Sequence, residues 1–188
     1  MALLDQREYE HIHIREVAEA AEVSLATLYR YFRSKEQLYA YVLLAWIDSY
    51  QDRVRADFDH PGDVGEHLRT ALRRAVRAHE QRPHFYRLIA MLEVVNDPAV
   101  SELFTGFISR FYGALGTTVA GLPPGEAAAI QMVSSAVLDA SLRQWALGRK
   151  SIRRVYADID TTIELIFRAP GGRAEIPDSP DRQKVAHG

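Results

Sequence analysis

Aromatic and basic side chains are concentrated in residues 22–36, which read Glu-Val-Ser-Leu-Ala-Thr-Leu-Tyr-Arg-Tyr-Phe-Arg-Ser-Lys-Glu. Tyrosine hydroxyls and lysine ammonium groups commonly bind phosphate, and arginine binds either phosphate or a base edge. Between Ser24 and Lys35 there are three basic residues and no acidic residue. Because phosphates attract basic groups, the segment is suited to binding a nucleic-acid backbone.

Two short helices are expected to position these side chains. Apolar residues recur at helical spacing from Ile14 to Ala21, and the pattern then breaks. The hydroxyl of Ser24 is a good cap for a second helix that begins directly after it. Because the two helices meet across about three residues, the pattern predicts a helix-turn-helix, whose second helix enters the major groove of DNA.

The second helix divides its side chains by size and chemistry. Leu25, Ala26 and the methyl group of Thr27 are slender enough to contact thymine methyl groups. The Thr27 hydroxyl can bond a base edge or a phosphate, and Arg30 can reach either a base or the backbone. The leading end of this helix is therefore expected to face the bases.

Core packing is the alternative explanation for some residues of this helix. Leu28 and Phe32 lie four residues apart and are predicted to be core residues. Tyr29 and Tyr31 are also able to pack beside them. They cluster, however, with basic residues in a segment free of acids, so we expect both tyrosines and Lys35 to contact phosphates.

The composition is that of a globular protein without a recognisable catalytic motif. The 188 residues are 47% apolar and 26% charged, and they carry a net charge of −2. Cysteine is absent, which excludes disulfides and thiolate sites. The seven histidines are scattered and form no His-Glu-x-x-His motif. We expect a cytoplasmic protein that is not an enzyme, needs no cofactor and does not enter a membrane.

Helical periodicity extends over almost the whole chain and predicts an all-α protein. We expect three regions: a helix-turn-helix domain at 1–44, a helical ligand-binding and dimerisation domain at 45–168, and a disordered tail at 169–188. The predicted helices after the motif run from Ser34 to 59–62, from Val64 to about Gln81, from Pro83, around 103–111, from Glu126 to Leu147 and from Ile152 to Ile166.

Residues 9–44 resemble the DNA-binding domain of TetR-family transcriptional regulators. The resemblance rests on Val17-Ala18-Glu19-Ala20-Ala21, Val23-Ser24, Thr27-Leu28-Tyr29-Arg30-Tyr31-Phe32 and Ser34-Lys35-Glu36-Gln37-Leu38. It implies a homodimer that represses by binding double-stranded DNA at an inverted-repeat operator and is released by a small molecule. It also implies DNA contacts at His13, Ser24, Leu25, Ala26, Thr27, Tyr29, Arg30, Tyr31 and Lys35.

Three positions depart from the family pattern. The chain is short by roughly one helix before Arg7, which predicts a truncated first helix. Glu22 stands where the turn usually has glycine, so we expect a slightly altered turn. His13 replaces the usual Ser or Thr cap, which should weaken the start of its helix. The alternative function is accordingly a helical ligand-binding dimer that has lost DNA binding.

The last two helices carry more apolar surface than one helix face needs, which favours dimerisation through a four-helix bundle, although core packing accounts for part of it. The apolar and small residues concerned are Ala127, Ala128, Ile130, Val133, Ser134, Val137 and Leu138, followed by Ile152, Val155, Tyr156, Ile159, Ile163 and Ile166.

An effector pocket is expected in the second domain. Its candidate lining residues, each of which also fits an ordinary core, are Phe85, Tyr86, Met91, Phe104, Phe107, Phe111, Asp139 and Trp145. Asp139 either faces the pocket or forms a simple helix pair with Arg143, four residues on. The aromatic lining favours a hydrophobic effector with one polar end. Similarity to actinobacterial sterol- and lipid-catabolism repressors suggests an acyl-CoA or a sterol-like molecule.

Overall fold

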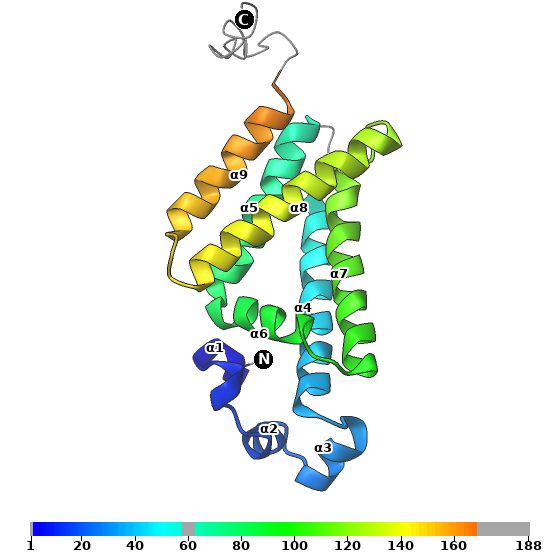
Figure 1. Cartoon of the computed structure of the whole chain (residues 1–188). Coiled ribbons are helices and arrows are strands. Elements are labelled where there is room, and N and C mark those ends of the chain that lie inside the picture. The colour runs from blue at the N-terminus through cyan, green and yellow to red at the C-terminus, as the bar shows by residue number, and fades with distance from the viewer. Residues whose placement is uncertain (1, 58–62, 169–188) are drawn as a thin grey trace, which may run out of the picture.

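The computed structural model describes residues 2–57 and 63–168, in which every regular element is a helix (Figure 1). This confirms the all-α prediction. The elements are α1 (Ala2–Gln6), the 3-10 helix η1 (Tyr9–His11), α2 (Ile14–Ala20), α3 (Leu25–Tyr31), α4 (Lys35–Asp57), α5 (Val64–Gln81), α6 (Pro83–Glu93), α7 (Pro98–Thr118), α8 (Pro124–Ala146) and α9 (Ile152–Ile166). No helix in these ranges is long and apolar enough to cross a membrane.

Helix starts follow the local chemistry that the sequence contains. Asp63, Asp97 and Ser151 each cap a helix, because a side-chain oxygen accepts a backbone N–H from the first turn. Proline occupies the first turn of α6, α7 and α8, where its fixed φ angle fits and its missing N–H costs nothing. The predicted tail at 169–188 and the chain at 58–62 lie outside the described residues.

The N-terminal unit contains α2 and α3 and a small core of its own. Ala18, Leu28 and Leu38 are its buried residues, contributed by α2, α3 and α4 respectively. Leu28 is therefore a core residue, as predicted, and Phe32 packs partly buried against the same cluster. Because α4 continues without a break from Lys35, the domain boundary expected at 44/45 lies inside this helix.

The turn between α2 and α3 keeps the left-handed conformation, so the expectation of an altered turn is wrong. Glu22 has φ = +54°, which costs a non-glycine residue about 1–2 kcal/mol. Two hydrogen bonds hold it there: the Glu22 N–H donates to the Glu19 carbonyl and the Val23 N–H to the Ala18 carbonyl, both at 3.0 Å. This is the Schellman pattern, which satisfies carbonyls at the end of α2 and offsets the strain.

The larger unit is built from α4 to α9. Helix α4 lies along α7, while α9 packs against both α8 and α5, and α6 crosses beneath them toward α1 (Figure 1). Its core is continuous and includes Leu43, Leu72, Leu115 and Ile159, each almost fully buried. The apolar faces predicted by helical periodicity thus meet in one interior.

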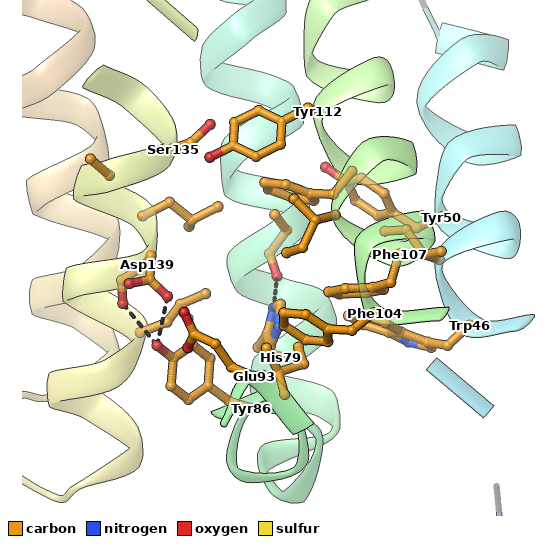
Figure 2. A pocket seen from close by; sticks show the side chains of 18 of the residues that line it. Trp46, Tyr50, His79, Tyr86, Glu93, Phe104, Phe107, Tyr112, Ser135 and Asp139 are labelled. Atoms are coloured by element: carbon orange, nitrogen blue, oxygen red, sulfur yellow. Dashed lines mark hydrogen bonds between the residues drawn. The ribbon is translucent and has the colours of Figure 1, made fainter. Parts of the chain in front are cut away.

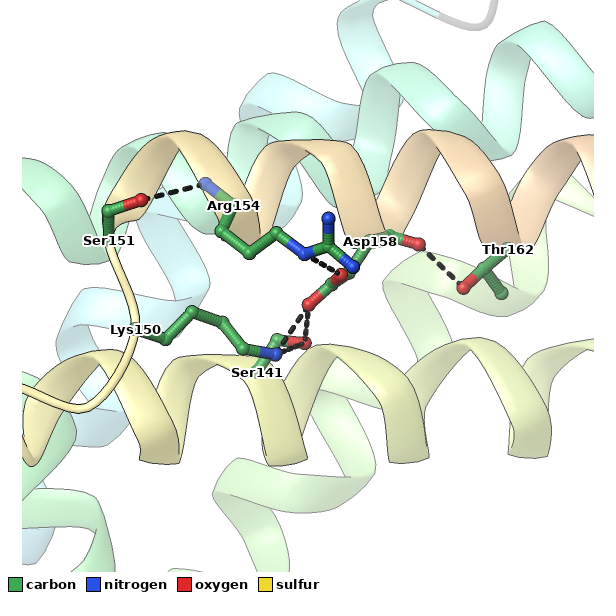
Figure 3. A network of polar contacts seen from close by, with 6 residues as sticks. All are labelled: Ser141, Lys150, Ser151, Arg154, Asp158 and Thr162. Atoms are coloured by element: carbon green, nitrogen blue, oxygen red, sulfur yellow. Dashed lines mark hydrogen bonds and ion pairs between the residues drawn. The ribbon is translucent and has the colours of Figure 1, made fainter.

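A polar network fixes α9 against the end of α8 (Figure 3). The Asp158 carboxylate accepts from Lys150 Nζ at 2.5 Å and from Ser141 Oγ at 2.9 Å, and Arg154 Nε lies 3.1 Å away. Burial acts to raise the pKa of Asp158, but the bonds from Lys150 and Ser141 outweigh it and hold the pKa below its ordinary value. The carboxylate is therefore charged at neutral pH.

Candidate nucleic-acid interface and ligand pocket

Helix α3 presents an aromatic and basic face to solvent. Tyr29 is 50% exposed and Tyr31 is 67% exposed, far more than ordinary core tyrosines. Arg30 lies over the Tyr31 ring, with its guanidinium carbon 5.4 Å from the ring centroid. Ala26 and Arg33 are exposed nearby. The helix therefore holds these side chains outward while Leu28 anchors it from behind.

The first turn of α3 is capped by the hydroxyl groups of Ser24 and Thr27. Ser24 Oγ accepts a hydrogen bond from the Thr27 backbone N–H at 3.0 Å and lies 2.8 Å from Thr27 Oγ1. Both hydroxyls therefore stabilise the first turn in the free protein. Leu25 is half-buried against the small core of Ala18, Leu28 and Leu38, so only part of its side chain is available to a partner.

The start of α2 is held by its third residue. Glu16 accepts from the His13 backbone N–H at 2.7 Å and pairs with Arg7 at 2.8 Å. The bond from His13 and then the one from Arg7 lower the pKa of Glu16. The His13 side chain is exposed at this end of the helix, on the same small unit as the α3 face.

Lys35 has a structural partner that the sequence did not reveal. Its Nζ donates to the Tyr9 carbonyl at 2.6 Å and lies 5.3 Å and 5.7 Å from the ring centroids of Tyr9 and Tyr39. Partial burial lowers the pKa of this lysine. Lys35 thus ties η1 to the start of α4. An ammonium group has three donors, so two remain for other acceptors.

A cavity of about 430 Å³ lies between α4, α5, α6, α7 and α8 (Figure 2). This volume is within the range of small-molecule sites. Five of the expected pocket residues line it: Tyr86, Phe104, Phe107, Phe111 and Asp139. The helix pair of Asp139 with Arg143 also exists, at 3.0 Å, so both interpretations of Asp139 hold together.

Three expected lining residues lie elsewhere. Phe85 is fully buried and packs on Trp46, with ring centroids 5.2 Å apart. Met91 and Trp145 are half-buried against the core and do not border the cavity. Phe85 and Tyr86 are neighbours on α6 and so point about 100° apart, which is why only one of them reaches the cavity.

Polar groups gather at one side of the cavity. The Tyr86 hydroxyl donates to Asp139 Oδ1 at 2.8 Å, and Glu93 lies beside them (Figure 2). Burial, reinforced by Asp139, raises the pKa of Tyr86, so its hydroxyl remains a donor. Arg143 lies 3.0 Å from Asp139 and 4.0 Å from Glu93. Both carboxylates are about half exposed, which places this polar group at the edge of the cavity.

Comparison with known proteins identifies the fold and the class. Residues 1–42 match the family model described as bacterial regulatory proteins, tetR family. Residues 1–42 are the N-terminal domain of the TetR family. Because regulators of this family act by binding DNA and not by catalysis, the chain is a DNA-binding transcriptional regulator and not an enzyme.

Relatives and solved structures agree with this assignment. The HTH-type transcriptional repressor KstR of Rhodococcus jostii (strain RHA1) is 26% identical over 179 residues, which are 93% of this chain and 82% of that protein. A TetR transcriptional regulator from Rhodococcus sp. RHA1 has a TM-score of 0.68 at 23% identity, covering 90% of this chain and 91% of its own. The fatty acid degradation regulator FadR from Bacillus halodurans has the same TM-score and coverages at 16% identity. This TetR-family fold therefore extends over both units.

Sequence reasoning missed several residues that line this cavity, among them Trp46, Tyr50, His79 and Glu93. Trp46 and Tyr50 fall within the long helix predicted from Ser34, and they lie on its cavity side. His79 is an unusual residue for the buried stripe of α5, and that was the one available signal. In the described ranges no group of three or more histidines and acids could hold a metal ion.

Helix α6 links the pocket of this TetR-family protein to its N-terminal segment. Arg82, which precedes α6, pairs with Asp5 at 3.1 Å, and Arg87 on α6 forms an ion pair with Glu8. Arg87 also donates to the Ala146 carbonyl at the end of α8, at 3.4 Å. Because Tyr86 lies on the same helix, a movement of α6 would change the contacts both at the cavity and at the N-terminal segment.

Proposed function

We propose that this chain is a ligand-responsive repressor, which binds an inverted-repeat operator as a homodimer and is released when a small apolar molecule fills the pocket. The observation that carries the proposal is the presence in one chain of an exposed α3 face and an apolar cavity, with α6 joining the cavity to the N-terminal segment. We place the protein in the cytoplasm, where its DNA is accessible. Each part of this proposal has its own support.

The DNA contacts are assigned to α3 and its surroundings. Ala26 and Thr27, with the exposed part of Leu25, would face bases, while Tyr29 and Tyr31 would contact phosphates. The remaining assignments follow from position: Ser24 at the cap, Arg30 beside Tyr31, His13 at the start of α2 and the two spare donors of Lys35. Ser24, Arg30 and His13 are exposed on one small unit, and Lys35 is half-buried beside them.

The dimer interface is assigned to α8 and α9, which lie side by side (Figure 1). Met132 is 65% exposed, Val133 43% and Leu165 64%, and such apolar exposure marks an interaction surface. Of the predicted stripes, Val133 belongs to this exposed group, whereas Ile130, Ser134, Leu138, Val155, Ile159 and Ile163 are buried within the protomer. Two helices from each protomer would form a four-helix bundle. Its twofold axis would set the recognition helices one DNA turn, about 34–36 Å, or a multiple of it, apart.

The effector is proposed to act through α6. A ligand that fills the cavity would contact Tyr86 and displace or tighten α6. Arg82 and Arg87 would pass that movement to Asp5 and Glu8 in the N-terminal segment. Each exposed ion pair contributes no more than about 1 kcal/mol of stability. Binding of a ligand could therefore break or rearrange these pairs. A lipid-like effector, acyl-CoA or sterol-like, agrees with the name of one structural neighbour as a fatty acid degradation regulator.

Footprinting of the purified full chain on the DNA upstream of its own coding region tests the regulator. The proposal expects protection of two half-sites related by a twofold axis. Protection of a single half-site would contradict the dimer. If no upstream or candidate inverted-repeat DNA is protected while the cavity still binds ligands, the alternative of a ligand-binding dimer without DNA binding would be correct.

A further inference from the structure

The cavity contains one polar atom that nothing in the described structure satisfies. His79 lies on α5 at the cavity wall, between Trp46 and Tyr86, and is 6% exposed (Figure 2). Its Nε2 is buried and has no hydrogen-bond partner. A buried polar atom without a partner costs free energy, so such atoms are rare unless a ligand or water supplies the bond.

The chemistry of that atom follows from the other ring nitrogen. His79 Nδ1 lies 2.8 Å from the Ala75 carbonyl oxygen, which only accepts hydrogen bonds, so Nδ1 carries the proton. Burial lowers the pKa of His79, which keeps the ring neutral near pH 7. In that tautomer Nε2 is an acceptor. The missing partner must therefore be a donor.

Three other hydroxyl groups on the cavity wall already donate to partners within the protein. The Tyr50 hydroxyl donates to the Ala71 carbonyl at 2.9 Å, and the Ser135 hydroxyl donates to the Gln131 carbonyl at 2.7 Å. The Tyr86 hydroxyl donates to Asp139. A ligand would therefore meet a mainly apolar wall, and these three hydroxyl groups do not donate to His79 Nε2.

The charges at the cavity disfavour an anionic ligand. The charged lining residues are both acidic, Asp139 and Glu93. Arg143, the nearby cation, already lies within 4.0 Å of both carboxylates. An anionic group would approach two like charges, while an ammonium group would lose its hydration beside aromatic rings. A neutral donor avoids both costs.

We propose that the effector is a neutral, mainly hydrocarbon molecule whose hydroxyl group donates to His79 Nε2. The inference rests on the proposed ligand-responsive function and narrows it, because it favours an alcohol over an anionic acyl-CoA. His79 is the specificity-determining residue, and the aromatic wall supplies the apolar contact. The carboxylates of Asp139 and Glu93, at the edge of the cavity, repel anionic ligands.

Three probes of similar size separate these features. 1-Nonanol donates and accepts, octyl methyl ether is its isomer without a donor, and nonanoate is an anion. Binding to the full chain can be followed by intrinsic fluorescence, because Trp46 lines the cavity. We expect 1-nonanol to bind about tenfold more tightly than the ether, the effect of one buried hydrogen bond. Nonanoate should bind more weakly than 1-nonanol.

His79→Phe tests the residue, because it keeps a ring against Trp46 and Tyr86 and removes the acceptor. The preference for 1-nonanol over the ether should fall to about one. Ser134→Ala is the matched control: Ser134 Oγ is also buried without a partner but lies outside the cavity lining. That variant should keep the tenfold preference. A preference that survives His79→Phe would remove this residue from the proposal.

The outcomes distinguish failure of the hydroxyl inference from failure of the proposed ligand-responsive function. Equal binding of 1-nonanol and the ether by the wild-type chain, as expected if a water satisfies Nε2, would overturn the hydroxyl inference and leave a ligand pocket intact. Tightest binding of nonanoate would overturn it as well. Failure of all three probes to saturate would contradict the pocket itself, and with it the ligand-responsive function. The wild-type comparison decides the matter even if His79→Phe does not fold.

Discussion

The two units of the molecule are stabilised to very different extents. The helix-turn-helix has a core of three buried residues, Ala18, Leu28 and Leu38, whereas α4 to α9 share one larger interior that also includes Leu4 of α1. Helix α4 joins them, since Leu38 belongs to the small core and Leu43 to the large one. The helix proposed to read DNA is therefore anchored by few buried residues, beside a larger unit with a core of its own.

The same two regions use aromatic side chains in opposite ways. Tyr29 and Tyr31 on α3 are exposed to solvent, where the proposed DNA partner would meet them. Trp46 and Phe107 line a cavity within it, which the proposed ligand would have to enter. A small unit with few contacts opens at low free energy, so its position is readily altered by events at the cavity. Four predictions test this contrast, in order of decreasing effect.

The largest effect is expected in the large core. Leu43 is fully buried on α4, and Leu43→Ala should lower the free energy of unfolding by about 2–5 kcal/mol. Urea denaturation followed by circular dichroism measures the change for the whole chain. A loss below about 1 kcal/mol, under half of the smallest usual cost, would mean that the core around α4 is not the platform described here.

Leu28→Ala should instead loosen only the small core. The expected cost is about 2 kcal/mol, at the low end for a buried leucine because its neighbours are partly exposed. Hydrogen exchange should accelerate at the amides of α2 and α3, while those of α5 and α7 stay protected. Equal acceleration in both units would show that they unfold together, and the contrast between them would fail.

Lys35→Ala separates the two roles assigned to this residue. Loss of one phosphate contact should lower the slope of log affinity against log salt by about one for every DNA sequence. Loss of its bond to the Tyr9 carbonyl should also loosen η1. Arg149→Ala, a loss of one charge in the loop between α8 and α9, is the control. A slope equal to that of the control would leave Lys35 with its structural role alone.

The smallest effect near neutral pH comes from His79. Its folded pKa is lower than its unfolded value, so protonation favours the unfolded chain. Stability should therefore be complete above about pH 6.5 and decline as the pH falls toward the folded pKa. Thermal unfolding of the wild type and of His79→Phe measures it. The variant should show a smaller decline over this interval, and an identical decline would place the titration elsewhere.

The exposed face could be predicted well because it is local. Tyr29, Arg30 and Tyr31 follow one another on a single short helix, so spacing alone decides which side chains face outward. Helix bounds were similarly accessible, since α5 and α9 begin and end where caps and periodicity indicated. The turn at Glu22 was not, because two backbone bonds outweigh the preference for glycine.

The cavity was predicted only in part because five helices build it. Periodicity indicates that Phe85 and Tyr86 are both apolar positions on α6, but the rotation of α6 against α8 decides which one reaches Asp139. Trp145 lies near the end of α8, away from the wall that the packing creates. Lys35 also depended on a long-range partner, the Tyr9 carbonyl 26 residues earlier.

We propose above all that occupation of the cavity lowers the affinity of the chain for DNA. Its most direct test is the dissociation constant of the full chain for its inverted-repeat DNA, measured with and without 1-nonanol while Trp46 fluorescence reports occupation of the cavity. Saturation of the cavity should raise this dissociation constant. An unchanged dissociation constant with the cavity demonstrably occupied would contradict it.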